Sequence, residues 1–290
     1  MRYKYYYYLI YNPKIIDVLE KYKIRYQVFE KTRITPSFIR FSFFSTSINA
    51  TEIACEIANI SRYNPIITAE YTDSEVTNAE WLWITPKRQS IDISNVPEAY
   101  LATCTYTDSF GMRRVSHQCQ RDLFMIEKEP VIGKQIAFWA ESTGLAEIFV
   151  DSRVRDLIEE NSLSGIELKK VLLKKGIYSS KVFQLTAQQV IDRQFIGTGY
   201  GEKIISCEFC GREQFVIEQA YQLHVDFSII DKKSDMYVTD RIFGEGISYP
   251  LYIISKRFYQ LLKGANLAGG ITVSPVVDIG DREDGSVVSG

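Results

Sequence analysis

The sequence predicts an α+β protein with more than one domain. Three observations support this prediction. The chain has 290 residues, which is enough for two domains of ordinary size. Its first 98 residues alternate between strand-like and helix-like patterns, and the remainder contains an internal repeat with a strand and a helix in each copy.

The N-terminal 98 residues have the pattern strand, helix, strand, strand, helix, strand. The first helix is expected after Asn12-Pro13, since Asn is a good N-cap and Pro suits a first helical turn. Asn49 is expected to cap the second helix, which would place Ile53 and Ile57 on one face. The strand-like runs are Tyr5–Tyr11, Ile24–Phe29, Phe38–Phe44, Ile66–Tyr71 and Trp81–Ile84. This order predicts a ferredoxin-like α/β sandwich over residues 1–98.

The tyrosine run from Tyr5 to Tyr8 has two interpretations. It could form a surface on which nucleic-acid bases stack, or it could be a strand packed on both faces. We favour the packed strand, because aromatic residues are enriched in strands for packing reasons alone.

Bulk composition gives few indications of a partner. The net charge is −2, so the chain as a whole has no attraction to nucleic acid or to an anionic membrane. We find no apolar run of the roughly 20 residues that a membrane helix needs, and no cleavable signal. Five cysteines, an odd number, suggest reduced thiols or metal ligands in a cytoplasmic protein.

Two sequence blocks recur in the same order in residues 99–276. Cys119–Lys128 matches Cys210–Gln219, and Ile148–Ile158 matches Tyr252–Leu262. The second block predicts a strand that ends at a capping residue, Asp151 or Ser255, followed by an amphipathic helix. Gly165 and Gly269 are then expected to turn the chain back into strands near Ile166 and Ile271. We therefore predict two copies of a knuckle–strand–helix–strand module at residues 116–171 and 207–276, followed by an acidic tail, 277–290, expected to be disordered past Asp281.

The second copy begins with Cys207-Glu-Phe-Cys210-Gly211, which is half of a zinc knuckle. The first copy has Ser116-His117-Gln118-Cys119-Gln120 at the matching place, so one cysteine and the glycine are replaced. This arrangement resembles the double-CXXCG immunity proteins of bacterial polymorphic-toxin systems. The resemblance covers roughly residues 100 to 276, and it departs from the family because only the second knuckle is intact.

If zinc is bound, Cys207, Cys210 and Cys119 are the first three candidate ligands, and Cys104 or His117 would be the fourth. A His two residues from a Cys is an uncommon spacing for one ion, so Cys104 is preferred. The alternative is that the site has decayed and these residues are reduced, half-buried thiols.

The resemblance implies an immunity protein that binds a cognate toxin domain stoichiometrically, and not an enzyme. The sequence agrees, because it has no nucleophile elbow, Walker loop or His-Glu-x-x-His motif. Toxin contacts are expected at exposed Tyr, Trp and Arg residues of the N-terminal domain or of the Ile230–Pro250 insertion.

A zinc-ribbon-like nucleic-acid-binding or regulatory protein is the alternative. The net charge argues against nucleic acid, although Lys169-Lys170 and Lys174-Lys175 form a small basic patch. A weaker hypothesis treats the N-terminal domain as a small-molecule sensor.

Overall fold

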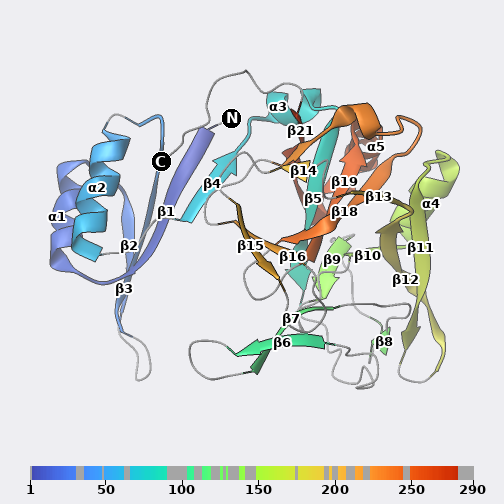
Figure 1. Cartoon of the computed structure of the whole chain (residues 1–290), viewed down its shortest axis with the longest axis horizontal. Helices are drawn as coiled ribbons and strands as arrows, with labels where there is room; N and C mark the ends of the chain where they lie inside the picture. Colours follow the sequence, from blue (N-terminus) through green and yellow to red (C-terminus); the bar gives the residue numbers. More distant parts are fainter. Residues whose placement is uncertain are drawn as a thin grey trace. The chain divides into compact units, whose positions relative to one another are not determined.

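The chain folds as a mixed α+β protein whose sheets are mainly antiparallel (Figure 1). A computed structural model describes residues 2–30, 36–47, 49–61, 66–89, 103–107, 113–118, 125–126, 129, 137–140, 148–173, 176–192, 196–197, 202–206, 213–217, 223–243 and 249–279. Five α-helices lie in these ranges, and none of them is long and apolar enough to cross a membrane. Contacts divide the chain into a first unit, Met1–Glu75, and a second unit that comprises Val76–Ile217 and Leu223–Gly290.

The first unit is a four-stranded sheet with two helices on one face (Figure 1). The strands lie in the order β2-β3-β1-β4, and every neighbouring pair is antiparallel. The elements are β1 (Arg2–Ile10), α1 (Pro13–Lys21), β2 (Tyr26–Phe29), β3 (Phe38–Phe44), α2 (Ala50–Ser61) and β4 (Ile66–Glu70).

Local sequence signals explain both helices of the first unit. The Asn12 side chain accepts the Lys14 N–H at 3.0 Å, and Pro13 is the first helical residue, so the predicted start of α1 is confirmed. Helix α2 begins directly after Asn49. The apolar stripes of both helices cover one face of the sheet, and the resulting core contains Tyr7, Leu9, Ile15, Val18, Leu19, Ile39, Phe41, Phe43, Ile53 and Ile57.

The opposite side of strand β1 is not packed in the way that we expected. Tyr7 and Leu9 point into the core and are 1% and 4% exposed. Tyr8 and Ile10 alternate with them and are 52% and 53% exposed. The expectation of a strand packed on both faces is therefore wrong, because both helices lie on the same side of the sheet.

The second unit is built around one large sheet. Its strands follow the order β15-β16-β18-β19-β5-β9-β10-β12-β11-β8, with β13 beside β18 and β20 beside β5. The strands of the second unit are β5 (Trp81–Gln89), β6 (Thr103–Thr107), β7 (Arg113–Gln118), β8 (Met125–Ile126), β9 (Ala137–Ala140), β10 (Ile148–Asp151), β11 (Ile166–Leu173), β12 (Tyr178–Ala187), β13 (Gln189–Ile191), β14 (Ile196–Gly197), β15 (Glu202–Ser206), β16 (Glu213–Ile217), β17 (His224–Val225), β18 (Met236–Phe243), β19 (Tyr249–Ser255), β20 (Ile271–Pro275) and β21 (Val277–Asp278). Strands β6 and β7 form a separate sheet, and so do β14, β17 and β21. The helices are α4 (Ser152–Glu160), α5 (Lys256–Gly264) and two 3-10 turns, Phe227–Ile229 and Ala268–Gly270, while α3 (Asp73–Asn78) spans the boundary between the units.

Two strand–helix pairs of the second unit, β10–α4 and β19–α5, are built alike. Asp151 and Ser255 have extended backbones, and their side chains cap the helix that follows: Asp151 accepts the N–H groups of Arg153 and Val154, and Ser255 accepts that of Phe258. Each helix is followed, directly after its C-cap, by a residue with positive φ, Ser162 at 50° and Asn266 at 61°. In both places the residue after this position donates a hydrogen bond back to the helix. The Leu163 N–H donates to the Ile158 carbonyl, and the Leu267 N–H donates to the Leu262 carbonyl.

Matching side chains of the two pairs enter the same hydrophobic core. Val154 of α4 and Phe258 of α5 are each 1% exposed. The core also holds the corresponding pairs Ile158 and Leu262, Leu163 and Leu267, Val150 and Ile254, and Ile148 and Tyr252. The two helices therefore bury the stripes that the sequence predicts.

Strand β5 belongs to the second unit, and this corrects our expectation that Trp81–Ile84 completes the N-terminal sheet. It pairs antiparallel with β19, where Leu82 faces Ile254, and with β20, where Ile84 faces Val273. The expected domain boundary at residue 98 lies outside the described residues, but this strand before it lies within the second unit. Its apolar side chains explain the placement, since Trp81, Leu82 and Ile84 are at most 3% exposed.

In the first strand–helix pair, β12 has the position that β5 has in the second. Val150 of β10 faces Phe183 of β12, as Ile254 faces Leu82. On the other side of β12, Leu185 faces Leu168 of β11, as Ile84 faces Val273 of β20. Both pairs thus have the same three-stranded register, although β12 follows its helix in the chain and β5 is the first strand of the unit.

The predicted copies differ before and after these pairs. Strand β8 pairs with β11, whereas β16, the corresponding part of the second copy, pairs with β15 and β18. Val277–Asp278 forms strand β21 beside β17, so the first two residues of the expected tail are part of the fold. Gly165 has the expected positive φ of 72°, but Gly269 lies in a 3-10 turn.

The placement of β5 predicts where the chain can be shortened. A chain beginning at Thr72 keeps β5 together with the hydrogen bonds between Thr72 and Glu75 that cap α3. We expect it to unfold in one cooperative transition, because it keeps the complete core of the second unit.

A chain beginning at residue 90 lacks β5, which leaves β19 and β20 without a common neighbour. Each large apolar side chain removed from a core costs about 2–5 kcal/mol, against a typical total stability of about 5–15 kcal/mol. This chain should therefore show no cooperative thermal transition by circular dichroism. A sharp transition in both shortened chains would contradict the assignment.

Candidate functional site

The cysteine positions that we predicted as metal ligands lie mostly outside the described residues. Cys119, Cys207 and Cys210 fall in the gaps, so the structure does not test them. Cys104 lies in β6 with His117 of β7 as its Cα partner. Directly opposed residues of antiparallel strands have Cα atoms about 4.5–5.5 Å apart, so the preferred fourth ligand, Cys104, and its alternative, His117, are neighbours.

The described part of the chain holds no group of three His, Cys, Asp or Glu residues that could bind a metal ion. Cys55, which is exposed on α2, is a free thiol. Three of the four predicted ligands lie outside this part, so the zinc site remains a prediction.

The acidic residues near α3 have separate structural partners. The Glu75 side chain accepts the Thr72 N–H at 2.7 Å, and Thr72 accepts the Glu75 N–H in return, which is a capping box. Glu80 pairs with Lys232 at 3.3 Å. Glu75 therefore caps α3, and Glu80 contributes to an ion pair.

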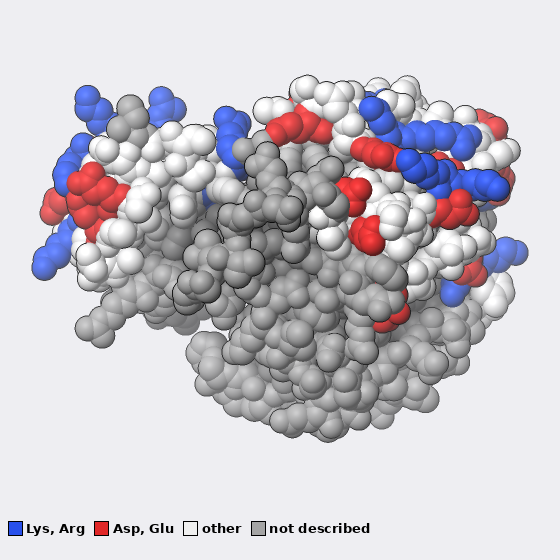
Figure 2. All heavy atoms as spheres, turned by 45° about the horizontal axis from the view of Figure 1, so that its top comes forward, with Lys and Arg blue, Asp and Glu red and all other residues white. Residues whose placement is uncertain are grey.

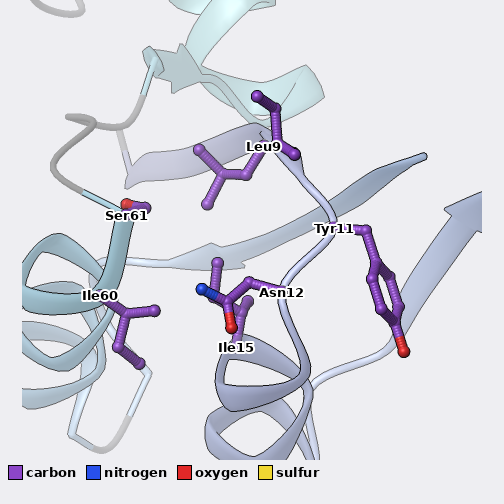
Figure 3. A pocket seen from close by; sticks show the side chains of 7 residues that line it. Leu9, Tyr11, Asn12, Ile15, Ile60 and Ser61 are labelled. Carbon is purple, nitrogen blue, oxygen red and sulfur yellow. The ribbon is translucent and has the colours of Figure 1, made fainter. Parts of the chain in front are cut away.

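A small hollow in the first unit lies between the end of β1 and the two helices (Figure 3). Its volume is about 190 Å³, and its walls include Leu9, Ile15 and Ile60. The Asn12 side chain at its rim accepts the Lys14 N–H, and the Ser61 hydroxyl donates to the Ile57 carbonyl. Ligand pockets of proteins are usually about 300–1,000 Å³, so this hollow is small for a substrate.

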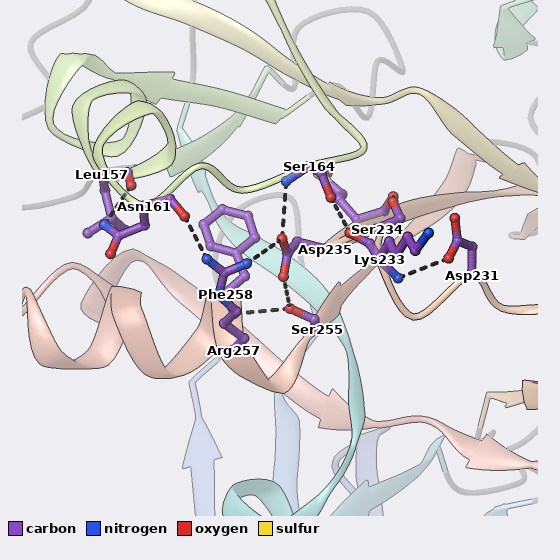
Figure 4. A network of polar contacts seen from close by, with 11 residues as sticks. Leu157, Asn161, Ser164, Asp231, Lys233, Ser234, Asp235, Ser255, Arg257 and Phe258 are labelled. Carbon is purple, nitrogen blue, oxygen red and sulfur yellow. Dashed lines mark hydrogen bonds and ion pairs between the residues drawn. The ribbon is translucent and has the colours of Figure 1, made fainter.

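The polar cluster around Asp235 joins the two strand–helix pairs (Figure 4). The Asp235 carboxylate is 6% exposed and accepts the Ser164 N–H at 3.1 Å and the Ser255 hydroxyl at 2.7 Å. It also pairs with Arg257 at 3.3 Å. Since Ser164 follows α4 and Ser255 caps α5, one carboxylate holds the end of the first pair against the start of the second.

Backbone hydrogen bonds and Arg257 reinforce this link. The Asp235 N–H donates to the Ser164 carbonyl at 2.8 Å, and the Ser255 N–H donates to the Asp235 carbonyl at 2.9 Å. Arg257 extends the cluster by donating to the Asn161 carbonyl at 2.6 Å (Figure 4). Gly165 must be glycine here, because its φ is positive and an added Cβ would overlap the Ser234 hydroxyl.

Arg153 of α4 and Arg257 of α5 occupy matching positions in the two pairs, and each has a carboxylate partner. In the first, Arg153 Nε donates to the capping residue Asp151 at 2.7 Å. In the second, the cap is Ser255, which carries no charge, and Asp235 from the preceding strand region supplies the carboxylate to Arg257. The cluster thus has a structural role, because its hydrogen bonds hold elements of the two pairs together.

Sequence reasoning did not find Asp235. It lies in the insertion of the second copy and has no motif around it, and its partners are distant in the chain. Tyr237 of the same insertion is 4% exposed and packs edge-on against Trp81 at 5.5 Å, so it is not one of the exposed aromatic residues at which toxin contacts are expected. Burial raises the pKa of the Tyr237 hydroxyl, which donates to the Asp231 carbonyl at 2.6 Å and stays neutral at physiological pH.

Replacing Asp235 tests the structural role of the cluster. Asp235→Ala leaves the Ser164 N–H and Arg257 without their acceptor, and such losses at a buried carboxylate cost about 3 kcal/mol. We expect urea denaturation to show a fall of that size in the free energy of unfolding, and a smaller fall for Asp235→Asn. Asp156→Ala is the control, because the Asp156–Arg155 pair is partly exposed, with the Asp156 side chain 48% exposed, and should contribute little. Equal effects at both positions would contradict the role of Asp235.

Comparison of the chain with known protein families, characterised proteins and solved structures found no match. The geometry described above and the sequence motifs are therefore the basis for any functional conclusion.

Proposed function

We propose that the first unit has a ferredoxin-like fold. Its order of elements is strand, helix, strand, strand, helix, strand, and the sheet order β2-β3-β1-β4 with antiparallel neighbours agrees with that topology. Four strands suffice for it, so Trp81–Gln89 is free to pair within the second unit.

The second unit, in this proposal, contains two copies of one strand–helix–strand module. The shared caps, the shared core positions and the shared register with β12 and β5 support duplication. The strand that completes the second copy comes from the start of the unit instead of its end. In an ancestral pair of modules this strand would follow the second helix, as β12 follows α4, and moving it to the start of the unit gives the present order.

We propose further that the chain is an immunity protein, which neutralises a cognate bacterial toxin in the cytoplasm by binding it. The observation that carries this proposal is the twofold occurrence, in one order, of a knuckle-type cysteine and the strand–helix block. The likeness of β10–α4 and β19–α5 agrees with it. Such a protein needs a scaffold that keeps its binding surface in one shape, and the buried core and the Asp235 cluster can provide that rigidity.

Zinc, where it is retained, would have a structural role in this function. We propose Cys207, Cys210 and Cys119 as ligands, with Cys104 as the fourth and His117, its partner across the β6–β7 ladder, as the substitute. A site with four protein ligands leaves no open position for water, so it would add stability without hydrolytic chemistry.

The zinc proposal predicts the metal content of the purified protein. Protein prepared without chelator should contain about one equivalent of zinc by elemental analysis, and Cys207→Ser should release most of it. Cys55→Ser is the matched control, since Cys55 is an exposed cysteine of the first unit. Less than about a tenth of an equivalent in the unaltered protein would mean that the site has decayed.

The immunity proposal predicts stoichiometric inhibition. The toxin to use is the product of the gene that neighbours this one, assayed for killing of a sensitive bacterium and then purified. Titration with the full chain should reduce toxin activity linearly until inhibition saturates near one equivalent, and dissociating the complex should restore the activity. Inactivation of a large excess of toxin by trace amounts, or chemical modification of the toxin, would mean that the chain is an enzyme.

A further inference from the structure

One face of the first unit's sheet carries aromatic and cationic side chains, and the two described helices, α1 and α2, pack on the opposite face. The register places the alternate residues of β1 and β3 on it, with Tyr8 opposite Arg40 and Ile10 opposite Phe38. Strand β2 adds Phe29, which faces Phe38. We call the surface formed by Tyr6, Tyr8, Ile10, Phe29, Phe38 and Arg40 the open face.

Exposure separates the open face from the face that the helices cover. Tyr7, Leu9, Ile39, Phe41 and Phe43 on the helix side are all buried. None of the six residues of the open face is buried, and Tyr8, Ile10 and Arg40 are exposed. A contiguous patch of accessible apolar side chains is a common mark of an interaction site.

The rings of the open face form a stacked group. Tyr8 and Phe38 lie nearly parallel, with ring centroids 4.8 Å apart and 14° between their planes. Phe29 approaches Tyr8 at 6.2 Å in a tilted arrangement. A planar ligand with a π-face can extend such a stack without needing a particular hydrogen-bond pattern.

Cations lie among these rings and beyond one end of them. Arg40 lies over the Tyr6 ring at 5.1 Å. Further along β1, Arg2 and Lys4 lie over the Phe44 ring at 4.3 Å and 5.3 Å. Glu70 of β4 partly neutralises that end, because it pairs with Lys4 at 3.0 Å and with Arg2 at 3.8 Å.

We propose that the open face binds single-stranded nucleic acid. Tyr8 and Phe38 would stack with unpaired bases, and Arg40, with Lys4 and Arg2, would contact the phosphates. Stacked aromatic rings next to cations, on the two central strands of a sheet, suit a chain of flat bases joined by anionic links. A duplex does not suit this surface, because its bases are already stacked on one another. The net charge of −2 describes the whole chain and does not oppose a local surface of this kind.

The test is fluorescence anisotropy of the full chain with labelled 12-nucleotide oligo-U RNA and oligo-dT DNA at low salt. We expect saturable binding to at least one of them, and the tighter of the two identifies the kind of strand. Loss of one stacking contact should make Tyr8→Ala about five- to hundredfold weaker. Arg40→Ala should weaken binding and reduce the slope of log affinity against log salt by about 0.7, because one phosphate contact is lost.

Two matched variants separate the open face from the rest of the unit. Tyr26→Ala removes an exposed tyrosine whose Cα partner, Phe41, lies on the helix side, and Lys14→Ala removes an exposed cation of α1. Both should bind as the unaltered chain does. Glu70→Gln should bind more tightly, since it removes the carboxylate that pairs with Lys4 and Arg2, a gain that a purely structural role would not produce. Thermal unfolding of each variant shows whether it is folded.

Three results would overturn the proposal. They are the absence of saturable binding to both oligonucleotides, equal weakening by Tyr8→Ala and the two matched variants, and equal affinity for a duplex of the same length. A protein partner that protects the open face from hydrogen exchange, with no oligonucleotide binding, would assign the surface to protein recognition instead. Toxin inhibition measured with the same variants is a separate readout, so the immunity proposal can stand or fail on its own.

Discussion

Strand β5 is hydrogen-bonded on both sides, to β19 along Trp81–Ile84 and to β20 along Leu82–Pro86. Without it these two strands would have no common neighbour, and helix α5 would lose part of the surface on which its apolar stripe rests. The core of the second unit therefore depends on a segment that lies far from both of these strands in the chain. Such non-local pairing costs loop-closure entropy, which the burial of three large side chains of β5 offsets.

The Asp235 cluster makes the arrangement of the two strand–helix pairs specific. Apolar packing alone tolerates small shifts, whereas a buried carboxylate keeps its hydrogen bonds at one relative position only. The first pair places its carboxylate at the cap, Asp151, and the second pair takes it from Asp235. This difference gives the second pair a polar contact that reaches the end of α4, through the Ser164 N–H and the Asn161 carbonyl.

Local signals were sufficient to predict α1, α2, α4 and α5, whereas the short helix α3 (Asp73–Asn78) was not predicted. Asn12-Pro13, Asp151 and Ser255 each identified a helix start, and the spacing of Val154 and Phe258 identified the buried stripes. Each of these signals depends on residues within one or two turns of the chain.

Features that depend on distant partners were not predicted. The run from Trp81 to Ile84 is a strand in either sheet, and only its neighbours decide which. Asp235 has no motif around it, and the open side of β1 followed only from where both helices packed. Cys119, Cys207 and Cys210 lie outside the described residues, so the predicted metal site depends on the sequence and on the pairing of Cys104 with His117.

Native-state hydrogen exchange tests the central claim, that β5 completes the core of the second unit. Both of its neighbours bond to it, so consecutive amides from Leu82 to Ile84 should be protected, whichever side each one faces. The account predicts that they exchange only with global unfolding of the second unit, as the amides of Phe183 and Leu185 in β12 should. Exchange of Leu82 and Ile84 together with the first unit, while β12 stays protected, would contradict it.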